Sequence, residues 1–170
     1  IACRTTFRGR WRPVMQPHTW TELFFLDEAT ALAAGHRPCA ECRYADYQRF
    51  RAAWAAWFGE PASAERMDAV LHGDRLEGRG ARQRKRTYQQ DIGALPDGVF
   101  IRLDGTDTNR DRVGSAWLRW RGHLLEWSPG GYIARRPLPP PGRVVEVLTP
   151  RALVGVLRSG YAVEVHPSAG

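Results

Sequence analysis

The chain has 170 residues, a formal net charge of +7 and a hydrophobic fraction of 43%. This length allows one well-packed core or two small subdomains, and the apolar fraction excludes an intrinsically disordered chain. No apolar run approaches the roughly 20 residues of a transmembrane helix, so we expect no membrane partner. The three cysteines, two of them in Cys-x-x-Cys spacing, favour a reduced, cytoplasmic setting with free or metal-bound thiols over a disulfide framework.

Short strands followed by one capped helix are predicted for the start of the chain. Residues 1–25 alternate loosely between polar and apolar types, which predicts two or three short strands, the last one ending at residues 23–25. Asp27 is suited to accept hydrogen bonds from the first free amides of a short helix. Gly35 stands where that helix needs a left-handed residue, and Pro38 prevents its continuation.

Two more helices are predicted before the middle of the chain. Residues 43–58 carry aromatic side chains at helical spacing, a pattern more typical of a core face than of a ligand cradle. These aromatic residues are Tyr47, Phe50, Trp54 and Trp57. Ser63 is placed to cap the next helix.

A strongly basic segment follows at residues 75–86. It holds six basic residues and one acidic residue, a net charge of +5, together with two glycines. Such a run is usually a solvated loop, but it also has the composition of an arm that binds phosphates. If the protein binds DNA or RNA, we expect the contacts to come from Arg79, Arg82, Arg84, Lys85 and Arg86, called the basic arm below.

The rest of the chain is richer in predicted strands. After a short polar helix ending near Gly93, strands are expected at residues 99–103, 115–121, 123–127, 144–148 and 161–165, with a hairpin turn at Arg121-Gly122 and a helix at residues 151–158. The predicted class is α+β: a small zinc-ribbon-like module with helices, then a small antiparallel sheet or partly open barrel with one helix. We place the boundary between residues 1–93 and residues 94–170.

One stretch resembles a known family. The run Ala33-Ala34-Gly35-His36-Arg37-Pro38-Cys39-Ala40-Glu41-Cys42, preceded by paired aromatics and an alanine-rich helix, resembles the metal-binding domain of the Ada family of bacterial DNA-alkylation response proteins. The resemblance covers about residues 1–43. It implies a zinc ion bound by four cysteines, two of them upstream, one of which accepts a methyl group from DNA phosphate. Here only Cys3 lies upstream, and Phe7 occupies the position four residues on.

The metal ligands are therefore only partly assigned from the sequence. Cys-x-x-Cys spacing lets Cys39 and Cys42 bind one tetrahedral zinc ion, and Cys3 is the third candidate. For the fourth position we consider His36 and His18, with water or a residue upstream of the chain as alternatives. The competing interpretations are packing for His36, which stands where the family has an aromatic residue, and reduced thiols without metal for the cysteines.

Three functions remain open from the sequence. The first is a zinc-binding bacterial protein that acts on or near nucleic acid through the basic arm. The second is a metal-thiolate enzyme, either a methyl acceptor with Cys3 as the reactive thiol or a hydrolase with an open zinc. The third is a protein-interaction module with a tryptophan-rich surface and no nucleic-acid partner.

Overall fold

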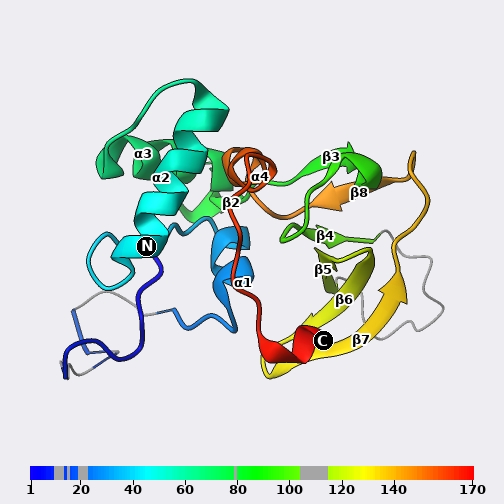
Figure 1. Ribbon diagram of the computed structural model, residues 1–170, viewed down its shortest axis with the longest axis horizontal. Coiled ribbons are helices and arrows are strands. Elements are labelled where there is room, and N and C mark those ends of the chain that lie inside the picture. Colours follow the sequence, from blue (N-terminus) through cyan, green and yellow to red (C-terminus); the bar gives the residue numbers. More distant parts are fainter. Residues whose placement is uncertain (10–13, 15, 19–22, 79, 104–114) are drawn as a thin grey trace.

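The computed structural model describes residues 1–9, 14, 16–18, 23–78, 80–103 and 115–170. Within them the chain forms the α-helices α1 (Glu28–Ala33), α2 (Tyr44–Phe58), α3 (Ala64–Arg75) and α4 (Arg151–Arg158). In Figure 1, α4 lies between α2 and the larger sheet. No helix among the described residues combines the length and the apolar character needed to cross a bilayer.

The larger sheet has six strands, all antiparallel to their neighbours, in the order β3-β8-β4-β5-β6-β7. These strands are β3 (Tyr88–Asp91), β4 (Phe100–Arg102), β5 (Ala116–Trp120), β6 (His123–Ser128), β7 (Gly131–Pro137) and β8 (Val144–Val147). A second small sheet pairs β1 (Leu76–Glu77) with β2 (Arg84–Lys85). The predicted α+β class is confirmed, and the described strands form an open antiparallel sheet rather than a closed barrel.

Several residues predicted to cap helices or form turns do so in the structure. The Asp27 Oδ1 atom accepts a hydrogen bond of 2.8 Å from the Thr30 amide and so caps α1. Gly35 follows α1 with a φ of +85°, the left-handed conformation that ends many helices. The Ser63 hydroxyl accepts from the third amide of α3 at 3.2 Å. The turn between β5 and β6 falls at Arg121-Gly122, where both residues have positive φ.

The strand predicted at residues 23–25 is not formed. None of these residues pairs with another strand, and the first two are 61% and 69% exposed. The Phe25 ring instead packs on the His36 ring, with 5.2 Å between centroids. Among the described residues up to position 25, the pairing found is a single parallel bridge between Ala2 and Pro38.

Strand pairing overrides two other local predictions. The segment Tyr88–Asp91, expected to lead into a polar helix, is strand β3 because it pairs with β8, for example Tyr88 with Val147. Strand β7 is missing from the prediction because its glycine-rich start has the composition of a turn. The partner of β3 is β8, far along the chain, whereas β7 pairs with β6, the strand just before it.

The last predicted strand, at residues 161–165, is an irregular segment. Two backbone amides, of Glu164 within it and of His166 just beyond it, are bonded to side chains at the start of α1 rather than to a neighbouring strand. The Glu164 amide donates to the Glu28 carboxylate and the His166 amide to the Asp27 carboxylate, each at 3.0 Å. Because these donors are already satisfied, the segment needs no strand partner.

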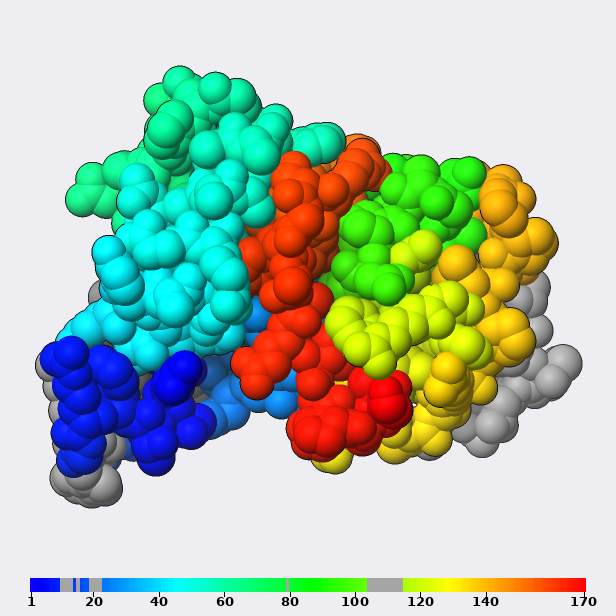
Figure 2. All heavy atoms as spheres, in the orientation of Figure 1, coloured from blue at the N-terminus to red at the C-terminus, as the bar shows by residue number. Residues whose placement is uncertain are grey.

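The core joins the helices to the sheet. The larger apolar cluster includes Phe50 of α2, Leu153 of α4 and Val147 of β8, all fully buried. A second cluster joins Ala29 of α1 to Leu118 of β5. Figure 2 shows the carboxy-terminal segment, in red, lying between the helices in cyan and the sheet in green and yellow. Both clusters draw on residues from either side of position 93, and the two-part division stays a prediction.

A buried carboxylate at the start of α1 ties the two ends of the chain together. Glu28 is 5% exposed and accepts a hydrogen bond of 2.7 Å from the Tyr161 hydroxyl. It also forms an ion pair of 2.9 Å with Arg43, the residue that follows the second cysteine of the Cys-x-x-Cys motif. The turn that carries the cysteines is thus attached to the carboxy-terminal segment through two residues.

Candidate metal centre

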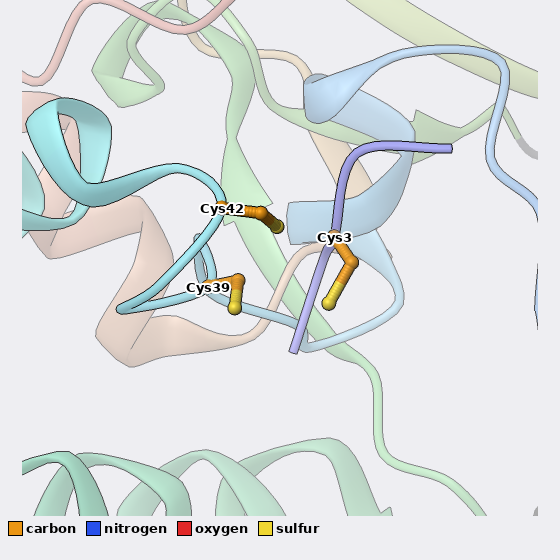
Figure 3. Close-up of side chains that lie close together, drawn as sticks. All are labelled: Cys3, Cys39 and Cys42. Carbon is orange, nitrogen blue, oxygen red and sulfur yellow. The ribbon is translucent and has the colours of Figure 1, made fainter. Parts of the chain in front are cut away.

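Three cysteines from two segments come together at the amino-terminal end of α2. The sulfur atoms of Cys3, Cys39 and Cys42 all lie within 4.8 Å of one another. Figure 3 shows them arriving from the first residues of the chain and from the turn between α1 and α2. A tetrahedral ion with metal–sulfur bonds of about 2.3 Å holds its sulfurs about 3.8 Å apart, so small movements suffice. The three residues can therefore hold a metal ion, and thiolates suit soft ions such as zinc.

A short parallel bridge places Cys3 beside the other two cysteines. The Ala2 amide donates to the Arg37 carbonyl at 2.7 Å, and the Cys39 amide donates to the Ala2 carbonyl at 3.0 Å. Pro38 has no amide to donate, but this pairing uses the groups on either side of it. Proline is therefore tolerated at the centre of the bridge, and it stiffens the turn that carries the thiols.

Helix α3 holds Arg37, which lies just before Cys39, in place. Arg37 is 4% exposed, and its guanidinium makes two hydrogen bonds to the Asp68 carboxylate, at 2.8 and 2.7 Å. It also donates to the Pro38 carbonyl at 3.1 Å. A Cβ atom at Gly35 would lie 2.6 Å from the Arg75 side chain, so glycine is required by contact as well as by its positive φ.

Backbone amides point at two of the sulfurs. The Glu41 amide donates to the Cys39 sulfur at 3.4 Å, and the Arg4 amide donates to the Cys42 sulfur at 3.2 Å. Burial acts to raise the pKa of Cys39, but the amides of Cys42 and Glu41 outweigh it and lower that pKa. Burial and the neighbouring thiols raise the pKa of Cys3 to about 12. A bound cation would favour the thiolate form of all three cysteines, because its positive charge offsets the repulsion between neighbouring thiolates and a coordinating thiol is deprotonated.

The two histidines considered as fourth ligands do not join the cysteine group. His36 faces away from it: its Nδ1 lies 3.0 Å from the Ile1 nitrogen and its Nε2 lies 3.4 Å from an Arg75 nitrogen. Burial, with nearby positive charge, lowers the pKa of His36 to about 4. His18 is exposed, in a turn with a φ of +62°. Among the described residues, the group that is close enough to share an ion consists of the three cysteines.

The basic arm is only partly available for an outside partner. The Lys85 ammonium donates to the Ala33 carbonyl at the end of α1 at 2.7 Å, and Arg84 pairs with Glu77 at 2.5 Å. Burial and the charges of nearby arginines lower the pKa of Lys85. Within the part of the chain that the structure describes, the side chains of Arg82 and Arg86 are exposed and make no hydrogen bond or ion pair. Arg79 lies outside the described residues.

Sequence reasoning missed the supports of the centre. Asp68, which holds Arg37, and Glu28, which holds Arg43, come from other helices and show no spacing relative to the cysteines. The only available signal was Arg37 beside Pro38 and Cys39, and it does not indicate which carboxylate the arginine contacts. Comparison with family models, with curated proteins and with solved structures finds no match for this chain.

Proposed function

We propose that the chain is a zinc-binding protein with an Ada-like module and that it acts on nucleic acid through its basic arm. The observation that carries the metal part is the convergence of the Cys3, Cys39 and Cys42 sulfurs within 4.8 Å. A donor set made of thiols favours zinc over harder ions such as magnesium or calcium. The resemblance of residues 33–42 to the Ada module supports the same ion.

In this proposal, zinc fixes the first residues of the chain to the turn before α2. Without the ion, the segment around Cys3 is attached by the two backbone hydrogen bonds of the Ala2–Pro38 bridge and by one contact each from Ile1 and Arg4. Such a short bridge recovers little of the entropy lost when the segment becomes ordered. The bound ion would supply the rest of the stabilisation.

Elemental analysis of the purified protein tests the metal part. We expect close to one zinc per chain, and we expect the Cys39→Ser/Cys42→Ser double variant to lose it. Cobalt substitution adds a readout of the ligands, because a tetrahedral cobalt–thiolate site absorbs strongly in the visible range. A protein that contains no metal and gives no cobalt spectrum would refute the proposal.

The nucleic-acid part is supported by the charge of the chain and by the two arginines of the arm whose side chains are exposed. Arg82 and Arg86 offer cations that no carboxylate neutralises among the described residues. Binding of an arbitrary nucleic acid should weaken steeply with added salt, as counterion release requires. The Arg82→Gln/Arg86→Gln variant should show a shallower salt dependence. Absence of binding at low salt would rule out this part and leave the zinc part standing.

A second candidate function, a metal-thiolate enzyme, is favoured by the position of Cys3. Cys3 is exposed, whereas Cys39 is buried. A zinc ion with three protein ligands keeps an open position, the arrangement found in catalytic sites. In the methyl-acceptor version, the Cys3 sulfur would form a bond to the methyl carbon of a phosphotriester, and a phosphodiester would leave. A mass increase of one methyl group on Cys3, after incubation with alkylated DNA, would distinguish this enzyme from a binding protein.

A further inference from the structure

A groove lies on the side of the molecule where α2, α3 and α4 meet β3. It consists of two adjoining cavities of about 460 and 390 Å³, which share Asp74, Tyr88 and Arg151 as lining residues. The larger cavity also includes Trp57 from the end of α2, and the smaller includes Arg86 of the basic arm. In Figure 1, α4 lies between α2 and β3. A volume of this size accommodates a small organic group.

The larger cavity has a fixed aromatic wall. Trp57 belongs to the aromatic stripe of α2, yet its residue is 43% exposed. A Cβ atom at Gly155 of α4 would overlap the Trp57 indole ring, so the ring rests directly on the helix backbone. Tyr88 is half-buried in the same cavity, and burial raises its pKa to about 12, so its ring stays neutral. Two ordered aromatic rings therefore line one hollow.

Positive groups surround these rings. The Arg151 guanidinium lies 3.7 Å from the centre of the Tyr88 ring, and the Arg158 guanidinium lies 5.6 Å from the centre of the Trp57 ring. Arg86 extends the positive charge into the smaller cavity, with no hydrogen-bond or ion-pair partner among the described residues. An aromatic wall edged by arginines has the composition of sites that stack a base and hold its phosphates.

The acidic residues of the groove are already engaged within the protein. The Asp74 carboxylate accepts a hydrogen bond of 2.6 Å from the Ala152 amide, near the amino-terminal end of α4. The Glu77 carboxylate pairs with Arg84 at 2.5 Å. Their negative charge is thus partly compensated by the protein itself, and the arginines give the groove a positive balance that is complementary to an anionic ligand.

We propose that this groove receives a single-stranded nucleic acid segment, with one base against Trp57 and Tyr88 in the larger cavity and the adjoining phosphates on Arg86 and Arg151. The inference rests on the proposed nucleic-acid function and adds the strand type and the binding surface. A single strand fits better than a duplex, because paired bases are stacked inside the helix and cannot enter a cavity.

The test measures binding of a fluorescein-labelled oligothymidylate of twelve residues, and of a duplex of the same length, by fluorescence anisotropy. We expect the single strand to bind more tightly than the duplex. Trp57→Ala should weaken its binding about tenfold or more, as expected for loss of a stacking platform. Arg86→Gln and Arg151→Gln should each lower the slope of log affinity against log salt by about 0.7. Arg135→Gln, an exposed charge change on β7 at the opposite edge of the sheet, is the matched control and should change neither value.

A second measurement guards against a folding defect in the tryptophan variant. Ultraviolet crosslinking of the wild-type protein to an oligonucleotide containing 5-iodouracil should label Trp57 or Tyr88, identified by mass spectrometry. If the protein binds neither nucleic acid, the proposed function fails together with this inference. If it binds, but prefers the duplex, crosslinks elsewhere or responds equally to the groove and control substitutions, the groove is refuted and nucleic-acid binding stands.

Discussion

Replacing Glu28 by glutamine is the sharpest test of how the cysteine-bearing turn is held in the fold. The Glu28 side chain is 2% exposed and lies 2.9 Å from the Arg43 guanidinium, whose side chain is 10% exposed. It also accepts hydrogen bonds from the Tyr161 hydroxyl and the Glu164 amide. Glutamine keeps the shape of this side chain but removes its charge and exchanges one acceptor oxygen for an NH₂ donor.

The expected loss follows from these contacts. Leaving a buried charge without its partner costs about 3–5 kcal/mol. Arg43 retains Asp46 at 2.9 Å, which reduces that cost. Glutamine can still accept one neutral hydrogen bond, but its NH₂ group meets another donor, and a charge-assisted bond of about 1.5–3 kcal/mol is lost. We therefore expect the free energy of unfolding to fall by about 2–3 kcal/mol.

Urea denaturation followed by tryptophan fluorescence, with zinc held at the same saturating concentration, measures this change. Glu164→Gln is the matched control, because that side chain is 81% exposed and lies 3.7 Å from the same Arg43 guanidinium. Its loss should be within about 0.5 kcal/mol, as for other exposed ion pairs. If the two variants lose equal stability, the buried carboxylate does not anchor the turn and the reasoning is wrong.

Three further outcomes are expected. Stability should fall as the pH is lowered from about 6.5 towards 4, because burial and nearby positive charge lower the pKa of His36 to about 4, so the unfolded chain binds a proton that the native chain does not. His36→Phe should flatten that part of a plot of urea midpoint against pH, and parallel curves would exclude His36 as its source. Gly155→Ala should destabilise the protein by about 1–3 kcal/mol, because the added methyl group overlaps the Trp57 indole ring of α2. Gly73→Ala, which has open space in α3, is the control and should stabilise the protein by up to about 1 kcal/mol. Equal shifts of the melting temperature in the two variants would contradict the packing at α4. Asp68→Ala should leave the buried Arg37 guanidinium without its carboxylate partner and lower the free energy of unfolding by about 2–4 kcal/mol. The same variant should bind cobalt more weakly in a spectroscopic titration. Unchanged cobalt affinity would show that α3 does not support the centre.

Signals that act within a few residues were readable from the sequence. The caps at Asp27 and Ser63, the left-handed Gly35 and the hairpin at Arg121-Gly122 all depend on the chain's immediate neighbours. Each satisfies a local requirement, either a free amide or a positive φ, that few residue types can meet. The two cysteines of the Cys-x-x-Cys motif belong to the same class, because their spacing alone lets both bind one ion.

Features that depend on distant partners were not readable. Strand β3 exists because β8 pairs with it, and the composition of Tyr88–Asp91 does not indicate this. The arrival of Cys3 depends on the bridge between Ala2 and Pro38, which the sequence did not indicate; the family resemblance implied only that an upstream cysteine is a ligand. The basic arm shows the same limit: its sequence is uniformly positive, but Lys85 is engaged at the end of α1 while Arg86 remains exposed.

The attachment of residues 161–166 to the start of α1 has a consequence for how the molecule is made. During synthesis the cysteine-bearing turn leaves the ribosome long before Tyr161 is made, so the Glu28 carboxylate initially lacks its hydroxyl donor. Contacts that span so much of the chain slow the search for the native state. The thiols of a nascent protein are thus made early, but the Glu28 carboxylate acquires its Tyr161 and Glu164 donors only after those residues have been synthesised.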